Sequence, residues 1–304
     1  MTTLHHIHRQ HLSSDTLINL PLVQENIRSA LLEDLGLIST DRPISELIQR
    51  DITAQLIPAN KVDTAQVICR DIATISGAAW VNEAFLACDS NLVLEWFVQD
   101  GDTVTANTVL FTVKGNAQAI LTAERVALNF LQTMSATATE TYKYVSLLAG
   151  SNTRLLDTRK TLPNMRYAQK YAVQCGGGTN HRIGLADAFL IKENHIMACG
   201  GIAAAISTAK RIAPNKSVEV EVETMAELDV AVNAGADIIM LDNFTTKQVL
   251  EAVEFTRQRA KLEVSGNITD TRISELKTTG VDFISTGAIT KNIHAIDLSL
   301  RIIK

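Results

Sequence analysis

The second half of the chain places cationic side chains beside short, mostly apolar or glycine-rich stretches. They follow or end the stretches TRLLDT, GGGTN and AFLIKE, and comprise Arg159, Lys160, His181, Arg182 and Lys192. Like charges that crowd together are unfavourable unless an anion compensates them. Arginine can bind a carboxylate or phosphate through two parallel hydrogen bonds, whereas lysine acts as a compact point charge. We therefore predict a pocket for a ligand rich in carboxylates or phosphates; ordinary surface salt bridges are the alternative.

Acidic side chains alternate with valine in the stretch SVEVEVE, at Glu219, Glu221 and Glu223. Because side chains alternate along a strand, the three carboxylates would share one face. A barrel strand is usually buried on both faces, so these carboxylates would need cations, sugar hydroxyls or a magnesium ion as partners. Asp242 ends the next apolar run and joins them one strand later. The alternative is an edge strand with a solvated acidic face.

Two successive apolar runs end in small residues that could bind a phosphate. The first ends in Ser265-Gly266-Asn267 and the second in Thr286-Gly287-Ala288. Such turns can present backbone N–H groups to a phosphate at the start of a helix. Many α/β barrels build their phosphate site after the last two strands, which is the pattern seen here.

Arg125 is a separate candidate. We expect a long helix with Thr122 as its N-cap and Gly150 just after its end, which places Arg125 in the first turn. A cation there opposes the helix macrodipole at a cost of about 0.3–1 kcal/mol. The position suggests an external anionic partner, such as the ligand of a neighbouring subunit; simple tolerance of the charge is the alternative.

The elements that must position these residues are short apolar strands alternating with helices. We expect strands at 153–158, 188–193, 218–223, 237–242, 261–266 and 282–287. The spacing of the last four, about 20 residues, is typical of βα units in a barrel or a doubly wound parallel sheet. Polar residues end nearly every strand, and in a barrel these ends meet at the face that carries the active site.

The first part of the chain has a different pattern. Residues 20–35 read as an amphipathic helix, a short helix is expected at 44–48, and the β-branched segments that follow are punctuated by Asp100-Gly101 and Lys114-Gly115. We therefore expect an N-terminal α+β domain over residues 1–121 and a catalytic α/β domain over 122–288. Residues 289–304 are expected to pack back on the N-terminal domain.

Composition limits the classes of function. The net charge of −5 argues against general nucleic-acid binding, and no apolar run approaches the roughly 20 residues of a membrane span. The four cysteines are scattered and are expected to be reduced thiols. The N-terminus has no apolar segment of a signal peptide, and its histidines are expected to be unstructured rather than metal ligands. We expect a soluble cytoplasmic protein.

From about residue 30 onward the motifs resemble one family closely. They are LTAERVALNFLQTMSATAT, DTRKT, GGGTNHR, KENH, VEVEVET, IIMLDNF, EVSGNIT and ISTGAIT. Their content and order resemble the quinolinate phosphoribosyltransferase family (nicotinate-nucleotide pyrophosphorylase, carboxylating). The resemblance implies an N-terminal α+β sandwich domain joined to an open, incomplete parallel α/β barrel. It also implies transfer of the phosphoribosyl group of phosphoribosyl pyrophosphate to quinolinate with decarboxylation, giving nicotinate mononucleotide, pyrophosphate and carbon dioxide in NAD biosynthesis.

The resemblance assigns roles residue by residue. Quinolinate would be held by Arg159, His181, Arg182 and Lys192, with Thr158 nearby and Lys160 between the two substrates. Glu221 and Asp242 would contact the ribose hydroxyls, directly or through Mg²⁺ and water, and are the expected catalytic residues together with Lys160. The two small-residue turns would bind the 5′-phosphate, with Lys291 or His294 as a further contact. Arg125 would reach the site of the partner subunit in a homodimer.

Three points stay open at this level. The family usually carries a compact EDxGxGDxT segment, whereas this chain has extra residues near 38–50 that could alter the entrance or the dimer contact. One alternative is a related protein with a changed substrate, such as the molybdenum-transport-associated homologue. A second is a non-catalytic carrier built on residues 62–115, which lack a suitably placed lysine.

Overall fold

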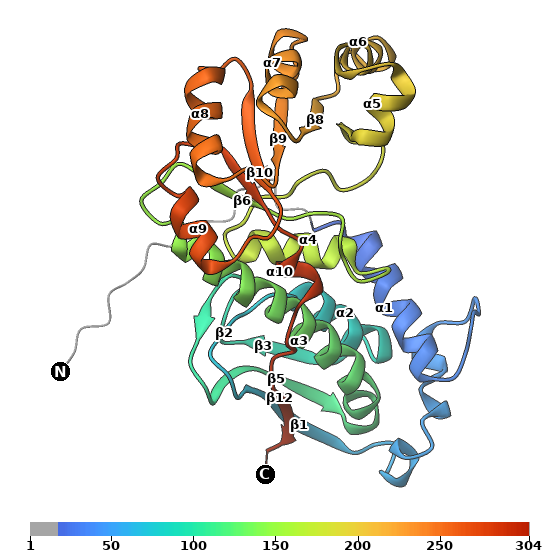
Figure 1. Cartoon of the computed structure of the whole chain (residues 1–304). Helices are drawn as coiled ribbons and strands as arrows, with labels where there is room; N and C mark the ends of the chain where they lie inside the picture. The colour runs from blue at the N-terminus through green and yellow to red at the C-terminus, as the bar shows by residue number, and fades with distance from the viewer. Residues whose placement is uncertain (1–17, 304) are drawn as a thin grey trace, which may run out of the picture. The chain divides into compact units, whose positions relative to one another are not determined.

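The structure, a computed structural model, describes residues 18–303 of the 304-residue chain (Figure 1). Its fold is mixed α/β, and the chain divides into two compact units. The N-terminal unit contains the described residues up to Thr139 together with residues 174–177 and 294–303, and the barrel unit contains residues 140–173 and 178–293. The histidines at positions 5, 6, 8 and 11, expected to be unstructured, lie outside the described residues.

The N-terminal unit is built on an antiparallel sheet with the strand order β12-β1-β5-β3. Its strands are β1 (Val62–Cys69), β3 (Val93–Trp96), β5 (Thr108–Asn116) and β12 (Leu298–Ile302). A smaller sheet pairs β2 (Ala73–Thr74) with β4 (Thr103–Val104). The last strand of the chain therefore lies beside β1, whereas residues 289–293 belong to the barrel unit.

Helix α1 (Leu20–Asp34) confirms the amphipathic helix expected at the start of the described chain. The side chain of Asn19 accepts a hydrogen bond from the backbone N–H of Leu22, which satisfies one free donor of the first turn. The apolar stripe of Val23, Ile27 and Leu31 is completely buried. Helix α1 packs against α2 (Ala78–Cys88), the other short helix of this unit.

The extra residues near 38–50 are folded onto α1. The expected short helix is instead a pair of 3-10 turns, Ile44–Glu46 and Ile48–Arg50, followed by a third at Ala54–Leu56. Arg28 of α1 donates through Nη2 to the carbonyl of Arg42 at 3.0 Å and to that of Thr40. The segment is thus tied to the helix by the guanidinium group of Arg28, which satisfies two loop carbonyls.

The long helix α3 runs from Ala117 to Leu147, so the expectation that it starts at Thr122 is wrong. The start is set by Asn116, the last residue of β5, whose Oδ1 accepts from the backbone N–H of Ala119 at 3.1 Å. Thr122 is buried inside the helix, with its Oγ1 3.0 Å from Gln118 O and from Asp51 Oδ2. The two units divide within α3, between Thr139 and Glu140, whereas the sequence placed the boundary before the helix.

The barrel unit contains a six-stranded parallel sheet with the order β6-β11-β10-β9-β8-β7. Its strands are β6 (Arg154–Leu156), β7 (Phe189–Ile191), β8 (Val218–Val222), β9 (Ile238–Asp242), β10 (Lys261–Ser265) and β11 (Phe283–Ser285). All six expected strands are confirmed. The sheet is an incomplete α/β barrel, because the edge strands β6 and β7 do not pair with each other within the described chain. Strand β8 lies between β7 and β9, so the edge-strand alternative for SVEVEVE is wrong.

Helices alternate with the strands of this sheet. They are α4 (Arg166–Cys175), α5 (Glu193–Cys199), α6 (Ile202–Ile212), α7 (Met225–Asn233), α8 (Thr246–Thr256), α9 (Asp270–Leu276) and α10 (Ala288–Lys291). Threonine N-caps begin three of them, because Thr224, Thr245 and Thr269 each accept a backbone N–H of the first turn. Each of these threonines lies a few residues after the end of a strand. The N-caps therefore set the length of the loops between β8 and α7, β9 and α8, and β10 and α9.

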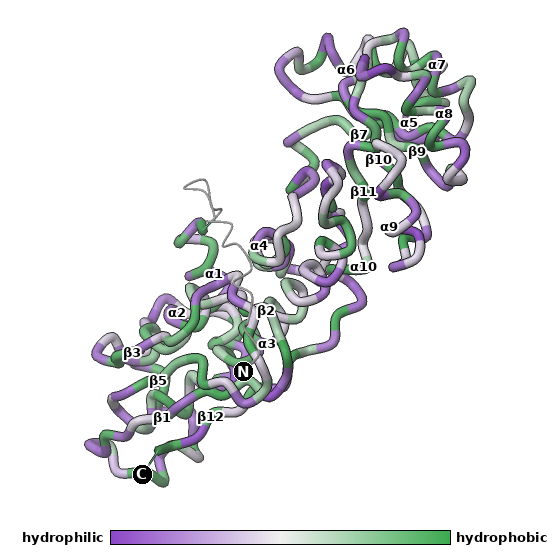
Figure 2. Tube along the Cα trace, turned by 90° about the vertical axis from the view of Figure 1, so that its left-hand side faces the viewer, coloured by the Kyte–Doolittle hydropathy of each residue, from purple (hydrophilic) through white to green (hydrophobic). Residues whose placement is uncertain are grey.

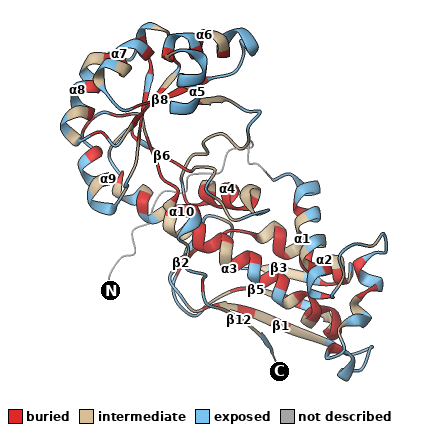
Figure 3. Cartoon of the chain, turned by 45° about the vertical axis from the view of Figure 1, so that its right-hand side comes forward, coloured by how far each residue is buried: buried red, intermediate tan, exposed pale blue. Residues whose placement is uncertain are grey.

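Burial follows the expected pattern of a βα sheet. The valines of β8 and the central residues of β9 and β10 are buried, and the helices α6–α9 present buried residues toward them and exposed residues to solvent (Figure 3). Hydrophobic stretches run through the strands and hydrophilic ones through many of the turns (Figure 2). Across residues 18–303, no helix is both long enough and apolar enough to span a membrane.

Candidate active site

The carboxyl ends of the parallel strands gather the predicted residues of the barrel unit at one edge of the sheet. Neighbouring strands are in matched register there: Ser265 of β10 pairs with Asp242 of β9, and Glu221 of β8 lies opposite Met240. Gly266 and Asn267 follow β10 directly. Other predicted residues follow the strands β6, β7 and β11, and are Thr158, Arg159, Lys160, Lys192, Thr286, Gly287 and Ala288. This is the edge at which parallel α/β barrels place their chemistry.

A buried ion pair shapes the loop that carries His181 and Arg182. Asp157 and Lys170 are only 0% and 1% exposed, and Lys170 Nζ lies 2.5 Å from Asp157 Oδ1. Asp157 also accepts from Asn180 Nδ2 at 2.7 Å and from the backbone N–H of His181 at 2.8 Å. Lys170 Nζ donates in addition to the carbonyl of His181 at 3.0 Å. Both backbone groups of His181 are thus fixed by one buried pair.

The ring of His181 faces two buried glutamates. Its Nε2 lies 2.8 Å from Glu219 Oε2 and 3.6 Å from Glu263 Oε2, and these side chains are only 4% and 0% exposed. Burial acts to lower the pKa of His181, but the carboxylates of Glu219 and Glu263 outweigh it and the pKa is raised. Burial, and then the charge of Glu219, raise the pKa of Glu263 to about 8.

Two arginines at the same edge are close enough to repel each other. Burial, and then the charge of Arg159, lower the pKa of Arg182. Arg182 Nη1 donates only a long hydrogen bond of 3.4 Å to the carbonyl of Ala188. The buried Nε of Arg159 has no hydrogen-bond acceptor within residues 18–303. The charges of Glu219 and Asp187 only partly offset this lowering for Arg182, so an anionic ligand would add the compensation that is missing.

The acidic side of the site consists of Glu221 and Asp242 on adjacent strands. Lys192 Nζ forms an ion pair with Glu221 Oε2. Burial, and then the charge of Glu221, raise the pKa of Asp242, whose Oδ2 accepts from Asn243 Nδ2 at 2.8 Å. The three glutamates differ in exposure: Glu219 is buried, Glu221 is partly exposed, and Glu223, which follows the end of β8, is exposed.

Both small-residue turns contain a glycine at which a Cβ would make a close contact. Gly266 has a φ of +94°, and a Cβ there would lie 2.3 Å from Asn243 Oδ1. A Cβ on Gly287 would lie 2.8 Å from Cδ of Lys160, so the Lys160 stem packs directly on this turn. The carbonyl of Lys160 accepts from Thr290 Oγ1 at 2.7 Å, which joins the β6 loop to α10.

The sequence analysis did not identify several residues that support this edge of the sheet. Gln169 is completely buried, accepts from the backbone N–H of Leu162 at 2.8 Å and donates to the carbonyl of Thr290 at 2.7 Å. Lys170, Asn180 and Glu263 were missed as well. Glu263 had a usable signal, since it is a charged residue in the middle of the apolar run KLEVSG.

Arg125 and His294 belong to the N-terminal unit, so the geometry above does not include them and their roles stay predictions. The argument from the helix dipole fails for Arg125, because α3 begins at Ala117 and Arg125 lies beyond its first turn. The side chain of Arg125 is 67% exposed and lies 3.3 Å from Glu124. Lys291 ends the short helix α10 and is exposed.

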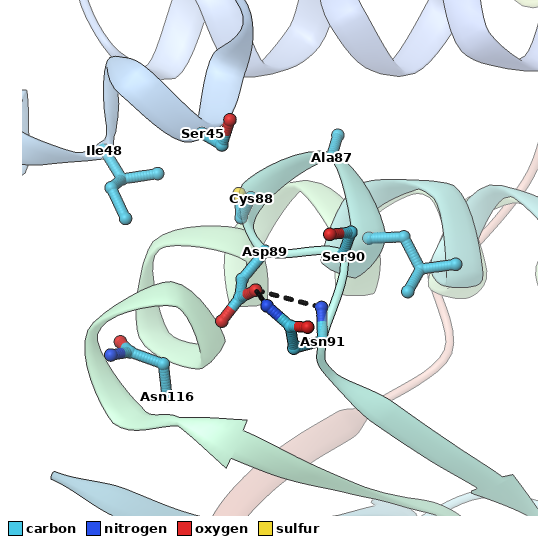
Figure 4. A pocket seen from close by; sticks show the side chains of 9 residues that line it. Ser45, Ile48, Ala87, Cys88, Asp89, Ser90, Asn91 and Asn116 are labelled. Carbon is cyan, nitrogen blue, oxygen red and sulfur yellow. Dashed lines mark hydrogen bonds between the residues drawn. The ribbon is translucent and has the colours of Figure 1, made fainter. Parts of the chain in front are cut away.

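The pocket in Figure 4 is a separate feature of the N-terminal unit. It is an open depression of about 370 Å³, in which Asp89 Oδ1 accepts from the backbone and side-chain nitrogens of Asn91, both at 2.9 Å. It is lined by Ser45, Ile48, Leu86, Ala87, Cys88, Asp89, Ser90, Asn91 and Asn116. None of these is a cation or a predicted site residue, so the pocket does not suit the expected anions.

Two sets of side chains in the barrel unit could hold a metal ion. Ligand atoms of His181, Glu219 and Glu263 lie within 4.8 Å of one another. Glu221 and Asp242 offer two carboxylates at the strand ends. Mg²⁺ typically uses one or two carboxylates together with substrate phosphates and water, so the second set fits the expected metal better.

Most of the chain matches two domains of one known family. Residues 51–135 match the N-terminal domain of quinolinate phosphoribosyl transferase, and residues 137–301 match its C-terminal domain. The chain belongs to the quinolinate phosphoribosyl transferase family. The junction of the two family domains falls inside α3, as does the division between the two compact units. The family match also excludes the carrier alternative, because residues 62–115 lie within the family's N-terminal domain.

Individual family members cover nearly the whole chain. A probable nicotinate-nucleotide pyrophosphorylase (carboxylating) of Bacillus subtilis is 39% identical over 82% of this chain and 87% of its own length. The corresponding enzyme of Mycobacterium leprae is 37% identical over 91% of this chain and 96% of its own length. The structure of the nicotinate-nucleotide pyrophosphorylase of Francisella tularensis superposes with a TM-score of 0.87 at 49% identity, covering 94% of this chain and 98% of that one.

Proposed function

We propose that this chain transfers the phosphoribosyl group of phosphoribosyl pyrophosphate to quinolinate with decarboxylation. The products are nicotinate mononucleotide, pyrophosphate and carbon dioxide, and the reaction belongs to de novo NAD biosynthesis. The proposal rests on family membership and on one observation above all. Arg159 lies close enough to Arg182 to lower its pKa despite the charges of Glu219 and Asp187, and the buried Nε of Arg159 has no hydrogen-bond acceptor within residues 18–303. A dicarboxylate such as quinolinate supplies the missing negative charge.

The two carboxylates of quinolinate are held by Arg159, His181, Arg182 and Lys192. Thr158 supports this part of the site, since its Oγ1 accepts from the backbone N–H of Lys160 at 3.1 Å. Lys160 extends along the Gly287 turn and stands between the two substrates. Binding both substrates at one edge converts a bimolecular encounter into a reaction between oriented groups, which is the main source of catalysis here.

The phosphoribosyl part of the site lies along β8 to β11. The ribose hydroxyls contact Glu221 and Asp242, and the 5′-phosphate is bound by Ser265, Gly266 and Asn267 together with Thr286, Gly287, Ala288 and Lys291. Glu221 and Asp242 are also the residues that would hold Mg²⁺, directly or through water. When bound, Mg²⁺ neutralises charge on the pyrophosphate of the substrate.

The reaction requires no nucleophile from the protein, because the ring nitrogen of quinolinate attacks the ribosyl carbon. Positive charge develops on that carbon as pyrophosphate leaves, and the carboxylate of Glu221 stabilises it. The carbon–carbon bond to the carboxylate beside the ring nitrogen then breaks. Its electron pair stays on the ring next to the positive nitrogen until a proton is taken up, and carbon dioxide leaves.

The assembly and location are also proposals. Arg125, exposed on α3, reaches the site of the partner subunit in a homodimer, where it adds a positive charge to the anion pocket. Sedimentation of the purified chain tests the dimer. A cytoplasmic location is supported by the four cysteines, Cys69, Cys88, Cys175 and Cys199, because none of them forms a disulfide within residues 18–303. Cell fractionation tests the location.

A product assay tests the proposed reaction. Purified protein is supplied with phosphoribosyl pyrophosphate, Mg²⁺ and either quinolinate or nicotinate. We expect nicotinate mononucleotide and an equal amount of carbon dioxide from quinolinate only. Arg182→Ala removes a charged hydrogen-bonding partner and is expected to raise KM for quinolinate about 10- to 100-fold. The matched control is Arg211→Ala, an exposed arginine of α6 in the same unit.

Either of two outcomes would contradict the proposal. An equal rise of the KM for quinolinate in Arg182→Ala and in the control would contradict the role of Arg182 in binding a carboxylate. Binding of phosphoribosyl pyrophosphate without product from either acid would leave the phosphate turns in place and exclude quinolinate. The changed-substrate homologue would then become the better interpretation.

A further inference from the structure

Arg182 lies in the loop between α4 and β7, and side chains hold the backbone of this loop. Four consecutive backbone N–H groups, from His181 to Gly184, each donate to a side chain. Loops are usually held more loosely than helices and strands, whose backbone groups bond to one another. The position of Arg182 therefore depends on the side chains that accept these hydrogen bonds.

The N-terminal side of Arg182 is held from the interior of the barrel unit. The buried carboxylate of Asp157 accepts from the N–H of His181 at 2.8 Å, and the buried Lys170 donates to the carbonyl of His181 at 3.0 Å. The N–H of Arg182 itself donates to Nδ1 of His181 at 2.7 Å. Everything before the Cα of Arg182 is thus fixed by a buried ion pair.

The C-terminal side of Arg182 is held by Asp187. A single oxygen, Asp187 Oδ2, accepts from the N–H of Ile183 at 2.5 Å and from the N–H of Gly184 at 3.0 Å. The N–H of Gly184, and then that of Ile183, lower the pKa of Asp187, so the carboxylate is charged at neutral pH. Asp187 is exposed, and none of the roles proposed above uses it.

Arg182 needs such support because its own side chain is poorly anchored. Its guanidinium donates only a long hydrogen bond of 3.4 Å to the carbonyl of Ala188. Burial, and then the charge of Arg159, lower the pKa of Arg182, so the two cations would separate if the loop were free to move. A guanidinium that is already in place when the ligand arrives avoids the entropy cost of ordering it during binding.

We propose that Asp187 is a positioning residue, which holds the N–H groups of Ile183 and Gly184 and thereby keeps Arg182 in place to bind a carboxylate of the substrate. The inference takes the role of Arg182 and its ligand, quinolinate, from the proposed function. It adds a residue that the sequence analysis did not identify and that acts through the backbone of the loop.

The charge and the hydrogen bonds of Asp187 have opposite effects on the binding of a dianion. Its negative charge acts on Arg182, whose pKa it raises, and by charge alone it repels a dicarboxylate. Its two hydrogen bonds favour binding because they hold the loop. Removal of the carboxylate should therefore strengthen quinolinate binding if only charge matters, and weaken it if the position of Arg182 matters.

The first test compares two substitutions of Asp187 by steady-state kinetics. Asp187→Ala removes both hydrogen bonds, and the KM for quinolinate is expected to rise about tenfold, which is the typical effect of one hydrogen bond to a charged group. Asp187→Asn keeps a neutral oxygen that accepts from the same N–H groups, so a rise of only about two- to threefold is expected. Asp229→Ala, which removes an exposed aspartate of α7, is the matched control for the loss of one surface charge.

Two further measurements separate positioning from general damage. Isothermal titration is expected to show unchanged affinity for phosphoribosyl pyrophosphate in all three variants, because this substrate binds along β8 to β11. Hydrogen exchange of the free protein, followed by mass spectrometry, is expected to be about tenfold faster over residues 178–190 in Asp187→Ala and unchanged in Asp229→Ala. Circular dichroism shows whether each variant is folded.

The outcomes separate the inference from the proposed function. An unchanged or lower KM for quinolinate in folded Asp187→Ala overturns the positioning role. An equal rise in Asp187→Ala and Asp187→Asn also overturns it, because the hydrogen bonds would not be the cause. Faster exchange over residues 178–190 in Asp187→Ala alone, together with no turnover of quinolinate by the unchanged protein, supports the hold on the loop and contradicts only the proposed reaction.

Discussion

At the scale of single residues, Asp157 and Lys170 show why the site could be predicted only in part. The sequence predicted the exposed or half-exposed cations from their place after strands. It could not predict that Lys170, in the middle of α4, is 1% exposed and paired with Asp157. Most lysines on helices are solvated, and only the folded chain reveals which one is enclosed.

Breaking this pair should be costly. Lys170→Met keeps the length and apolar stem but leaves Asp157 buried without its cation, which typically destabilises a protein by about 3–5 kcal/mol. Urea denaturation measures the loss. The control is Lys247→Met, because the Lys247–Glu251 pair of α8 is exposed and should contribute less than about 0.5 kcal/mol. Similar losses of unfolding free energy in both variants would show that burial does not make the loss of the Asp157–Lys170 pair more costly than the loss of an exposed pair.

At the scale of elements, strands were easier to predict than helix ends. Each of the six parallel strands was marked by an apolar run with a polar end. The start of α3 was misplaced because Thr122 resembles an N-cap, whereas Asn116 at the end of β5 performs the capping. Thr122 cannot be told from an N-cap by sequence alone, because it is its contact with Asp51, a residue far away in the sequence, that encloses it inside the helix.

The turn after β11 depends on a close approach between elements. Gly287→Ala would place a methyl group 2.8 Å from Cδ of Lys160, so the lysine stem or the turn must move. We expect binding of phosphoribosyl pyrophosphate to weaken about tenfold or more, because a displacement of about 1 Å is enough to disturb a positioned group. Isothermal titration measures the affinity. Gly184→Ala is the matched control, since a Cβ there meets nothing within 4 Å; equal weakening in both would refute the close-packing argument.

At the scale of the whole molecule, the family match and the sheet topology agree on an incomplete barrel whose strand ends carry the chemistry. The sequence predicted the set of strands but not the interior cluster formed by His181, Glu219 and Glu263. The groups that face Glu263 are Glu219 of β8, His181 of the loop after α4 and Ser285 of β11. Those contacts depend on the register of neighbouring strands, which no local pattern encodes.

The interior cluster should make the stability of the whole molecule depend on pH. The folded chain holds the proton of Glu263 up to a pKa of about 8, whereas the unfolded chain releases it near the ordinary value of about 4.5. Between these values the folded state binds more protons, so the free energy of unfolding contributed by this group falls as the pH rises, by at most about 1.4 kcal/mol per pH unit. Above pH 8 both states have lost the proton and the contribution is constant. Glu263→Gln should flatten the dependence between pH 5 and pH 8 in urea denaturation, relative to Glu254→Gln. A slope that survives in Glu263→Gln would mean that another group holds the proton.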